Sequence, residues 1–247
     1  MAKLKVMTWN VWLMEKADNI LSLIKEIQPD ILCCQELTTD SFINPGRNIP
    51  SEISKLMSMD YKYQQVLKRP DEQYYKIGNA IFSKLPIIDY KFSYIGQTSP
   101  DSPNYPYERR VYMEVNLKTD DKTLTVGTTH LSYSHAFKIT PKRREEVDGL
   151  VDSVKNNKER FVLASDLNSL PNSRTIAELK KYFEHTGPPY KEPTWTTKSF
   201  SYQGFEASTL DWRLDYIFAT KDIKMLSNEI IKTEFSDHLP ILAEIEI

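Results

Sequence analysis

Short apolar runs that end in a polar residue recur along this chain. One of them, Phe161–Asp166, predicts a buried strand with a carboxylate at its end. Leu4–Thr8, which is followed by Asn10, and Asp30–Glu36 have the same form. Because ligands bind at strand ends in open α/β sheets, these polar residues are candidates for a functional site. Taken alone, Asp166 is better explained as an Asx-turn residue that closes its strand.

Segments in which apolar residues recur at helical spacing lie between several of these runs. Asp18–Ile27 has one apolar face, and the crossover it makes between Leu4–Thr8 and Asp30–Glu36 predicts parallel strands. Thr140–Asn156, with Pro141 in its first turn, predicts a second amphipathic helix. Two shorter helices are expected at Pro50–Met59 and Ser173–Tyr182.

Strands dominate the rest of the pattern, and several neighbours look joined by hairpins, such as Arg110–Leu117 with Thr123–Thr129. Three prolines exclude regular structure from Gly96–Tyr107. This pattern predicts two packed mixed sheets with helices outside, a four-layer α/β/β/α sandwich. The other expected strands are Tyr61–Leu67, Gly78–Ser83, Ile87–Ile95, Thr194–Thr196, Arg213–Ala219, Asn228–Lys232 and Ile241–Ile245.

Composition narrows the class of protein. The 247 residues, 40% of them hydrophobic, contain no linker-like or low-complexity stretch, so we expect a single domain over residues 1–247. The net charge of −2 excludes a basic field over the whole protein that would attract nucleic acid, but it does not exclude a local basic patch. Cys33 and Cys34 are adjacent and would point to opposite faces of a strand, which argues against a structural disulfide. Without a signal peptide or a long apolar run, we expect a cytoplasmic monomer that does not insert into membranes.

Polar residues that suit a metal and a phosphate sit at six strand ends. Mg²⁺ prefers one or two carboxylates together with water and substrate oxygens, so Glu36 with Asp237 and Asn10 nearby would be enough. No Cys/His spacing resembles a zinc site. The six positions are Asn10, Glu36, His130, Asp166 with Asn168, Asp215, and Asp237 with His238.

Six short motifs around these positions resemble those of the endonuclease/exonuclease/phosphatase (DNase I-like) superfamily, in the same order. The resemblance extends from Thr8 to His238, almost the whole chain. It is strong for the superfamily and weak for the substrate. The motifs are Thr8-Trp9-Asn10, Gln35-Glu36, Thr129-His130-Leu131, Ser165-Asp166-Leu167-Asn168, Arg213-Leu214-Asp215-Tyr216-Ile217 and Ser236-Asp237-His238.

The resemblance implies a metal site and a water site. Glu36 matches the principal Mg²⁺ ligand, with Asn10 and Asp237 near the metal, and Mn²⁺ is a possible substitute. Asp166 matches the residue that orients or deprotonates the attacking water, and Asn168 would hold a phosphate oxygen or that water. The alternative for Glu36 is a surface residue that caps its strand.

The resemblance also implies roles for three further residues. His238 matches the histidine that stabilises charge on the phosphorus, and Asp215 the carboxylate that fixes its tautomer. His130 matches a second phosphate-contacting histidine, with a structural hydrogen-bonding role as the alternative. Ser165 stands where the family usually has glycine, so the geometry of this turn is uncertain. The other histidines, His135 and His185, are read as surface or loop residues.

The substrate class stays open at this stage. The Thr129-His130-Leu131 motif resembles the branch that holds tyrosyl-DNA phosphodiesterase 2, deadenylases and sphingomyelinases, so nucleic acid is the first expectation. Phospholipids, inositol phosphates and other small phosphoesters are the alternative, followed by a non-catalytic phosphate-binding module. Basic and aromatic residues that either contact nucleic acid or form a solvated surface are Arg109, Arg110, Lys142, Arg143, Arg144, Tyr105, Tyr107, Tyr133 and Phe137.

Overall fold

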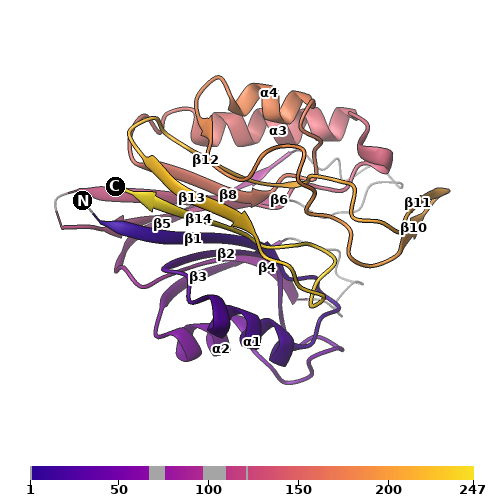
Figure 1. Ribbon diagram of the computed structural model, residues 1–247, viewed down its shortest axis with the longest axis horizontal. Helices are drawn as coiled ribbons and strands as arrows, with labels where there is room; N and C mark the ends of the chain where they lie inside the picture. Colours follow the sequence, from indigo (N-terminus) through magenta and orange to yellow (C-terminus); the bar gives the residue numbers. More distant parts are fainter. Residues whose placement is uncertain (1, 67–75, 97–109, 121) are drawn as a thin grey trace.

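Two six-stranded mixed sheets pack face to face, and helices cover both outer faces (Figure 1). The computed structural model describes residues 2–66, 76–96, 110–120 and 122–247. The four-layer α/β/β/α sandwich expected from the sequence is therefore confirmed.

The first sheet carries the N-terminal half of the motifs. Its strands in spatial order are β13 (Lys224–Ile230), β14 (Ile241–Glu246), β1 (Lys3–Asn10), β2 (Ile31–Thr39), β4 (Lys76–Ser83) and β3 (Asp60–Gln65). Helix α1 (Ala17–Ile27) connects β1 to β2, which pair in parallel as predicted. With α2 (Ile49–Met57) it covers the outer face of this sheet.

The second sheet carries the remaining strands of the sandwich. In spatial order these are β5 (Ile87–Ile95), β6 (Arg110–Lys118), β7 (Thr123–Thr129), β8 (Phe161–Asp166), β12 (Asp215–Ala219) and β9 (Glu184–His185). Strands β7 and β8 pair in parallel, whereas β12 runs antiparallel to β8. Helices α3 (Pro141–Val154) and α4 (Arg174–Leu179) lie on the outer face.

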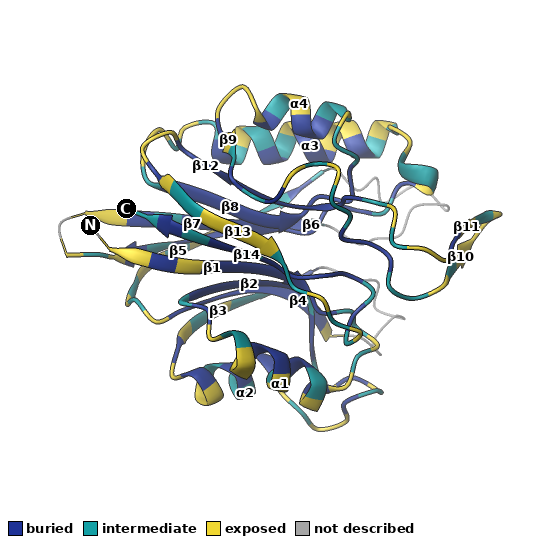
Figure 2. Ribbon diagram, in the orientation of Figure 1, coloured by how far each residue is buried: buried dark blue, intermediate teal, exposed yellow. Residues whose placement is uncertain are grey.

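Three apolar layers hold the sandwich together, one between the two sheets and one under each pair of helices. In Figure 2 the inner strands that border these layers are coloured as buried. Cys33 faces the layer between the sheets, whereas Cys34 faces the layer under α1 and α2. Both thiols are buried and free, as the alternation along the strand predicts. No helix in the described parts of the chain is long and apolar enough to span a bilayer.

One predicted helix and one predicted strand differ clearly from the observed α4 and β13. The helix expected at Ser173–Tyr182 spans only α4, because Ser173 is its N-cap and the chain leaves the helix after Leu179. This exit lets the Phe183 ring pack 5.0 Å from the Phe161 ring. The strand expected at Asn228–Lys232 is β13, which starts earlier because its pairing with β14 begins at Lys224.

The C-terminal third also departs from the predicted strands. Thr194–Thr196 is not a strand, although Trp195 makes single bridges to Trp212 and His238. The strand expected from Arg213 begins at Asp215. A hairpin of β10 (Phe200–Tyr202) and β11 (Phe205–Ala207) was not predicted and projects from the body (Figure 1). Leu67 and residues 97–107 of the proline loop lie outside the described residues.

Candidate active site

One edge of the sandwich gathers the predicted site residues. Asn10 ends β1 and Asp166 ends β8, while His130 directly follows β7. Because β12 is antiparallel to β8, its first residue, Asp215, pairs with Asp166. His238 lies just before β14, the antiparallel neighbour of β1.

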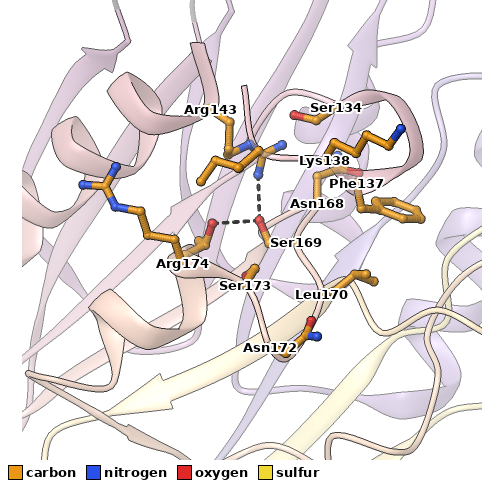
Figure 3. A pocket seen from close by; sticks show the side chains of 12 residues that line it. Ser134, Phe137, Lys138, Arg143, Asn168, Ser169, Leu170, Asn172, Ser173 and Arg174 are labelled. Carbon is orange, nitrogen blue, oxygen red and sulfur yellow. Dashed lines mark hydrogen bonds between the residues drawn. The ribbon is translucent and has the colours of Figure 1, made fainter. Parts of the chain in front are cut away.

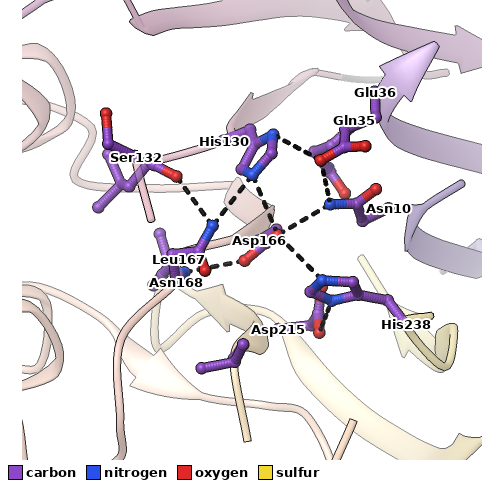
Figure 4. Close-up of polar contacts among 12 residues, drawn as sticks. Asn10, Gln35, Glu36, His130, Ser132, Asp166, Leu167, Asn168, Asp215 and His238 are labelled. Carbon is purple, nitrogen blue, oxygen red and sulfur yellow. Dashed lines mark hydrogen bonds and ion pairs between the residues drawn. The ribbon is translucent and has the colours of Figure 1, made fainter. Parts of the chain in front are cut away.

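Asp166 lies at the centre of the hydrogen-bond network (Figure 4). Its carboxylate is fully buried, and Oδ2 accepts a hydrogen bond of 3.0 Å from Asn10 Nδ2. The same oxygen lies 3.3 Å from His130 Nε2 and 3.7 Å from His238 Nε2. Oδ1 accepts a hydrogen bond of 2.8 Å from the backbone N–H of Asn168. Both imidazoles therefore face one carboxylate.

The protonation of Asp166 is set by opposing effects. Burial raises the pKa of its carboxyl to about 7, against a lowering by the nearby His238 and a further rise from Asp215. A carboxyl whose pKa lies near neutrality can gain and lose a proton at working pH. This is the property that a general base needs.

His238 and Asp215 form a buried ion pair. His238 Nδ1 lies 2.9 Å from Asp215 Oδ2, and both side chains are almost completely buried. Burial alone would lower the pKa of His238, but the carboxylates of Asp215, Asp166 and Asp237 raise it well above its ordinary value. The imidazole is therefore charged at neutral pH, and its Nε2–H faces the centre of the site.

Glu36 occupies a bulge in β2. The pairing of β2 with β4 shifts between Cys34 and Leu37, and Glu36 has a left-handed φ of 60°. Its Oε2 accepts a hydrogen bond of 2.9 Å from Leu13 N–H, and Oε1 accepts one of 3.3 Å from Asn10 Nδ2. The bulge and these bonds aim the carboxylate at the site, where 16% of its surface remains exposed.

The surroundings of Glu36 fit a hard cation. Burial and the negative charge of Asp237 raise the pKa of Glu36, so a cation between the two carboxylates would relieve their repulsion. Carboxylate and amide oxygens are the ligands that Mg²⁺ and Mn²⁺ prefer. One oxygen of Asp237 also accepts a hydrogen bond of 3.0 Å from Trp195 Nε1, which fixes its orientation.

A second group of potential ligands consists of Asp166, Asp215 and His238, whose donor atoms lie within 4.8 Å of one another. However, the raised pKa of His238 keeps a proton on the ring, and a protonated imidazole has no lone pair for a metal. Glu36, with Asn10 and Asp237 near it, is therefore the carboxylate of this edge that could hold a divalent cation.

His130 differs from His238 in charge. Burial and the neighbouring Arg110 cation lower the pKa of His130 well below its ordinary value, so its ring is neutral. Asn168 Nδ2 lies 3.0 Å from His130 Nε2 and donates a hydrogen bond of 3.0 Å to the carbonyl of Leu131. Asn168 itself has a left-handed φ of 44°, which turns its amide back toward the histidine.

Ser165 keeps ordinary strand geometry, so the uncertainty about its turn is resolved. It pairs with Tyr216 in the ladder between β8 and β12 and is not among the residues with positive φ. Its buried hydroxyl accepts a hydrogen bond of 3.0 Å from the backbone N–H of Thr129. A serine here ties β8 to the end of β7.

Several residues that orient the site had no role in the sequence prediction. Thr194 Oγ1 accepts hydrogen bonds from the N–H groups of Leu214 and Asp215, at 3.1 and 3.3 Å. Ser236 Oγ donates to the Asn10 carbonyl at 2.7 Å and accepts from His238 N–H at 3.0 Å. Threonine and serine at loop positions are too common to be recognised as such supports in one sequence.

From the sequence, Arg143 is expected to lie on a basic surface of its helix, and this expectation is wrong. Its side chain is only 4% exposed, and Nη1 donates hydrogen bonds of 2.6 Å to the Leu167 carbonyl and 2.7 Å to Ser169 Oγ. Nη2 donates to the carbonyl of Ser132. Arg143 therefore clamps together the loops after β7 and β8 and is not available to nucleic acid.

The remaining candidates have mixed outcomes. Tyr133 and Phe137 pack edge to face at 5.9 Å within an aromatic cluster that includes Phe200. His135 lies in the short 3-10 helix His135–Phe137 and is exposed, as expected for a surface residue, and its ring contacts that of Phe205. His185 instead lies in β9, stacked 4.3 Å from Tyr190, so its assignment to surface or loop is wrong. Tyr105, Tyr107 and Arg109 lie outside the described residues.

The sequence pattern of the Endonuclease/Exonuclease/phosphatase family matches residues 7–238, and the chain belongs to this family. Members of this family are phosphoesterases, and the site described above provides a matching set of acidic, amide and imidazole groups. No curated protein matches the chain.

Several solved structures share the fold. An endonuclease/exonuclease/phosphatase from Beutenbergia cavernae superposes with a TM-score of 0.78 at 21% identity, over 100% of this chain and 72% of that one. D. rerio TDP2 complexed with a single-strand DNA product gives 0.72 at 16% identity, over 100% of both chains. The human Nocturnin catalytic domain with bound sulfate gives 0.72 at 17% identity, over 99% of this chain and 94% of that one.

Proposed function

We propose that this protein is a Mg²⁺-dependent phosphodiester hydrolase that acts on nucleic acid by in-line attack of water. The observation that carries the proposal is the pair of imidazoles on opposite sides of Asp166, one neutral and one charged. This hydrolysis needs a base for the attacking water and a cationic donor for a phosphate oxygen. Asp166 would be the base and charged His238 the donor.

Glu36 is the principal metal ligand in this proposal, with Asn10 and Asp237 beside it. The part of the Glu36 carboxylate that stays exposed, 16% of the side chain, and its repulsion with Asp237 support this role. Bound Mg²⁺ would polarise the phosphate and offset charge on the leaving oxygen.

Asp166 orients the attacking water and takes its proton, because its pKa lies near neutrality. His238 donates its Nε2–H to a phosphate oxygen as negative charge develops there, while Asp215 keeps the imidazole charged. Asn168 and neutral His130 hold a second phosphate oxygen or the water. Water attacks phosphorus directly, so no covalent bond to the protein is formed.

Nucleic acid is the proposed substrate class. D. rerio TDP2, a protein of similar fold, was solved with a single-strand DNA product, which supports this choice by analogy. The experiment that tests it is a comparison of single- and double-stranded DNA, abasic DNA, 5′-phosphotyrosyl DNA, RNA and sphingomyelin with Mg²⁺. Cleavage of a nucleic acid, absent in Glu36→Gln, is expected. Cleavage of sphingomyelin alone would contradict the choice.

A further inference from the structure

A pocket of about 290 Å³ opens beside the active site (Figure 3). It lies between the loop after β7, which contains Phe137 and Lys138, and the segment from Asn168 to Thr175. Asn168 belongs both to the pocket and to the hydrogen-bond network around Asp166. A group in this pocket would therefore lie next to the phosphate that is hydrolysed.

The pocket wall is cationic. Lys138, Arg143 and Arg174 line it, and none of the described lining residues is Asp or Glu, although the chain as a whole has a net charge of −2. Arg143 is occupied by its backbone hydrogen bonds and lies 3.7 Å from a Glu146 carboxylate oxygen, so the exposed Lys138 carries most of the uncompensated charge. Arg174 pairs with Asp148 at 2.5 Å through one nitrogen and has further N–H donors on its guanidinium. This charge distribution favours an anionic ligand.

One side of the pocket is apolar and held in place. The Phe137 ring lies 5.0 Å from the Trp212 ring and 5.8 Å from that of Trp195. Phe137 and Ala136 both have left-handed φ values, 56° and 50°, which cost energy in residues other than glycine. Retained backbone strain of this kind is typical of binding sites. Leu170 adds further apolar surface.

We propose, on the basis of the function proposed above, that this pocket binds one nucleotide of single-stranded nucleic acid, adjacent to the scissile phosphate. Lys138 and Arg174, which extend to opposite sides of the pocket in Figure 3, contact different phosphates of the strand, and the base of the bound nucleotide packs against Phe137. The volume is at the lower end of the range for small-molecule sites, about 300 Å³ and above, so one nucleotide fits and a base pair does not. The pocket thereby selects single strands over duplexes.

The test measures binding separately from turnover. A fluorescein-labelled hexanucleotide, as DNA and as RNA, is titrated in EDTA and followed by anisotropy over a series of salt concentrations. Lys138→Ala and Arg174→Ala are each expected to raise Kd about five- to tenfold, the size of one ordinary hydrogen bond. Each is also expected to reduce the slope of log Kd against log salt by about 0.7, the value for one lost phosphate contact on a single strand.

Phe137→Leu separates the base contact from the phosphate contact. It keeps an apolar side chain but removes the aromatic face, so Kd is expected to rise while the salt slope stays constant. Lys55→Ala, at an exposed lysine on α2, is the matched control and is expected to change neither quantity. Unchanged Kd in both Lys138→Ala and Arg174→Ala, or tighter binding of a duplex than of the single strand, would overturn the proposal.

Failure of the pocket and failure of the hydrolase are distinguishable. Wild-type hydrolysis of bis-p-nitrophenyl phosphate without any binding of the hexanucleotides would overturn the pocket and leave the hydrolase standing. Binding with the expected effects of the variants, but no hydrolysis with Mg²⁺ or Mn²⁺, would support the pocket and refute the hydrolase.

Discussion

Asp215 Oδ2 lies 2.9 Å from His238 Nδ1, in a pair that is almost completely removed from solvent. Its partner position across the ladder is Asp166, the proposed base, so β8 and β12 hold the base and the carboxylate that pairs with His238 in fixed register. The paired strands therefore set the separation of Asp166 and Asp215.

Removal of the Asp215 charge should reduce catalysis. Asp215→Asn keeps the size of the side chain but removes the charge that keeps His238 protonated, so turnover is expected to fall about 10²-fold, as for loss of one transition-state donor. Asp120→Asn, at an exposed turn, is the control. Steady-state kinetics on a generic phosphodiester measures the effect. Wild-type turnover in Asp215→Asn would show that the pair has no catalytic role.

The pKa values of the two histidines should be shifted in opposite directions from the ordinary histidine value. In metal-free protein, the raised pKa of His238 should keep its imidazole protonated at pH values above about 6.5, the ordinary pKa of histidine. The lowered pKa of His130 should keep its imidazole neutral at pH values well below about 6.5. NMR titration of the imidazole carbons measures both. In Asp215→Asn, the titration of His238 should move to lower pH. A pKa of His238 at or below the ordinary value in wild-type protein would contradict the assignment of its charge.

Metal binding should be visible without any turnover. Mg²⁺ that binds only folded protein stabilises it by about 2.7 kcal/mol at a hundred times its Kd, so Tm is expected to rise with Mg²⁺. Glu36→Gln should abolish this rise, and EDTA should reverse it in wild-type protein. Glu26→Gln, on the exposed face of α1, should retain it. An equal rise in Glu36→Gln would place the metal elsewhere.

Ser165 should contribute to stability through its hydroxyl. Ser165→Ala leaves the buried N–H of Thr129 without its acceptor, which costs about 1–3 kcal/mol in the free energy of unfolding. Urea denaturation measures this difference, with the exposed Ser22→Ala as control. If the two variants were equally stable, the hydrogen bond from Thr129 would have no net effect.

The sandwich could be predicted from sequence because its inner strands are apolar on both faces and its longer helices each carry an apolar stripe. β8, for example, is buried along its whole length. The site could be predicted only in part. The residues at strand ends were found, because the strands themselves bring Asn10, Asp166 and Asp215 to one edge.

Features that depend on distant contacts could not be predicted. Arg143 looked like part of a basic helix face, and only the packing of α3 against the loops after β7 and β8 reveals it as buried. The length of β13 is set by its pairing with β14, since its own residues are largely polar or half-buried. The pocket beside Asn168 joins two loops that are more than 25 residues apart.

The most direct test of the central claim is hydrolysis of bis-p-nitrophenyl phosphate by purified protein. We predict release of p-nitrophenol with Mg²⁺, its loss with EDTA and its return when Mg²⁺ is restored. His238→Ala is expected to reduce the rate at least about 10²-fold, the loss typical of one transition-state donor. No release with either Mg²⁺ or Mn²⁺, or an equal rate in His238→Ala, would contradict the claim.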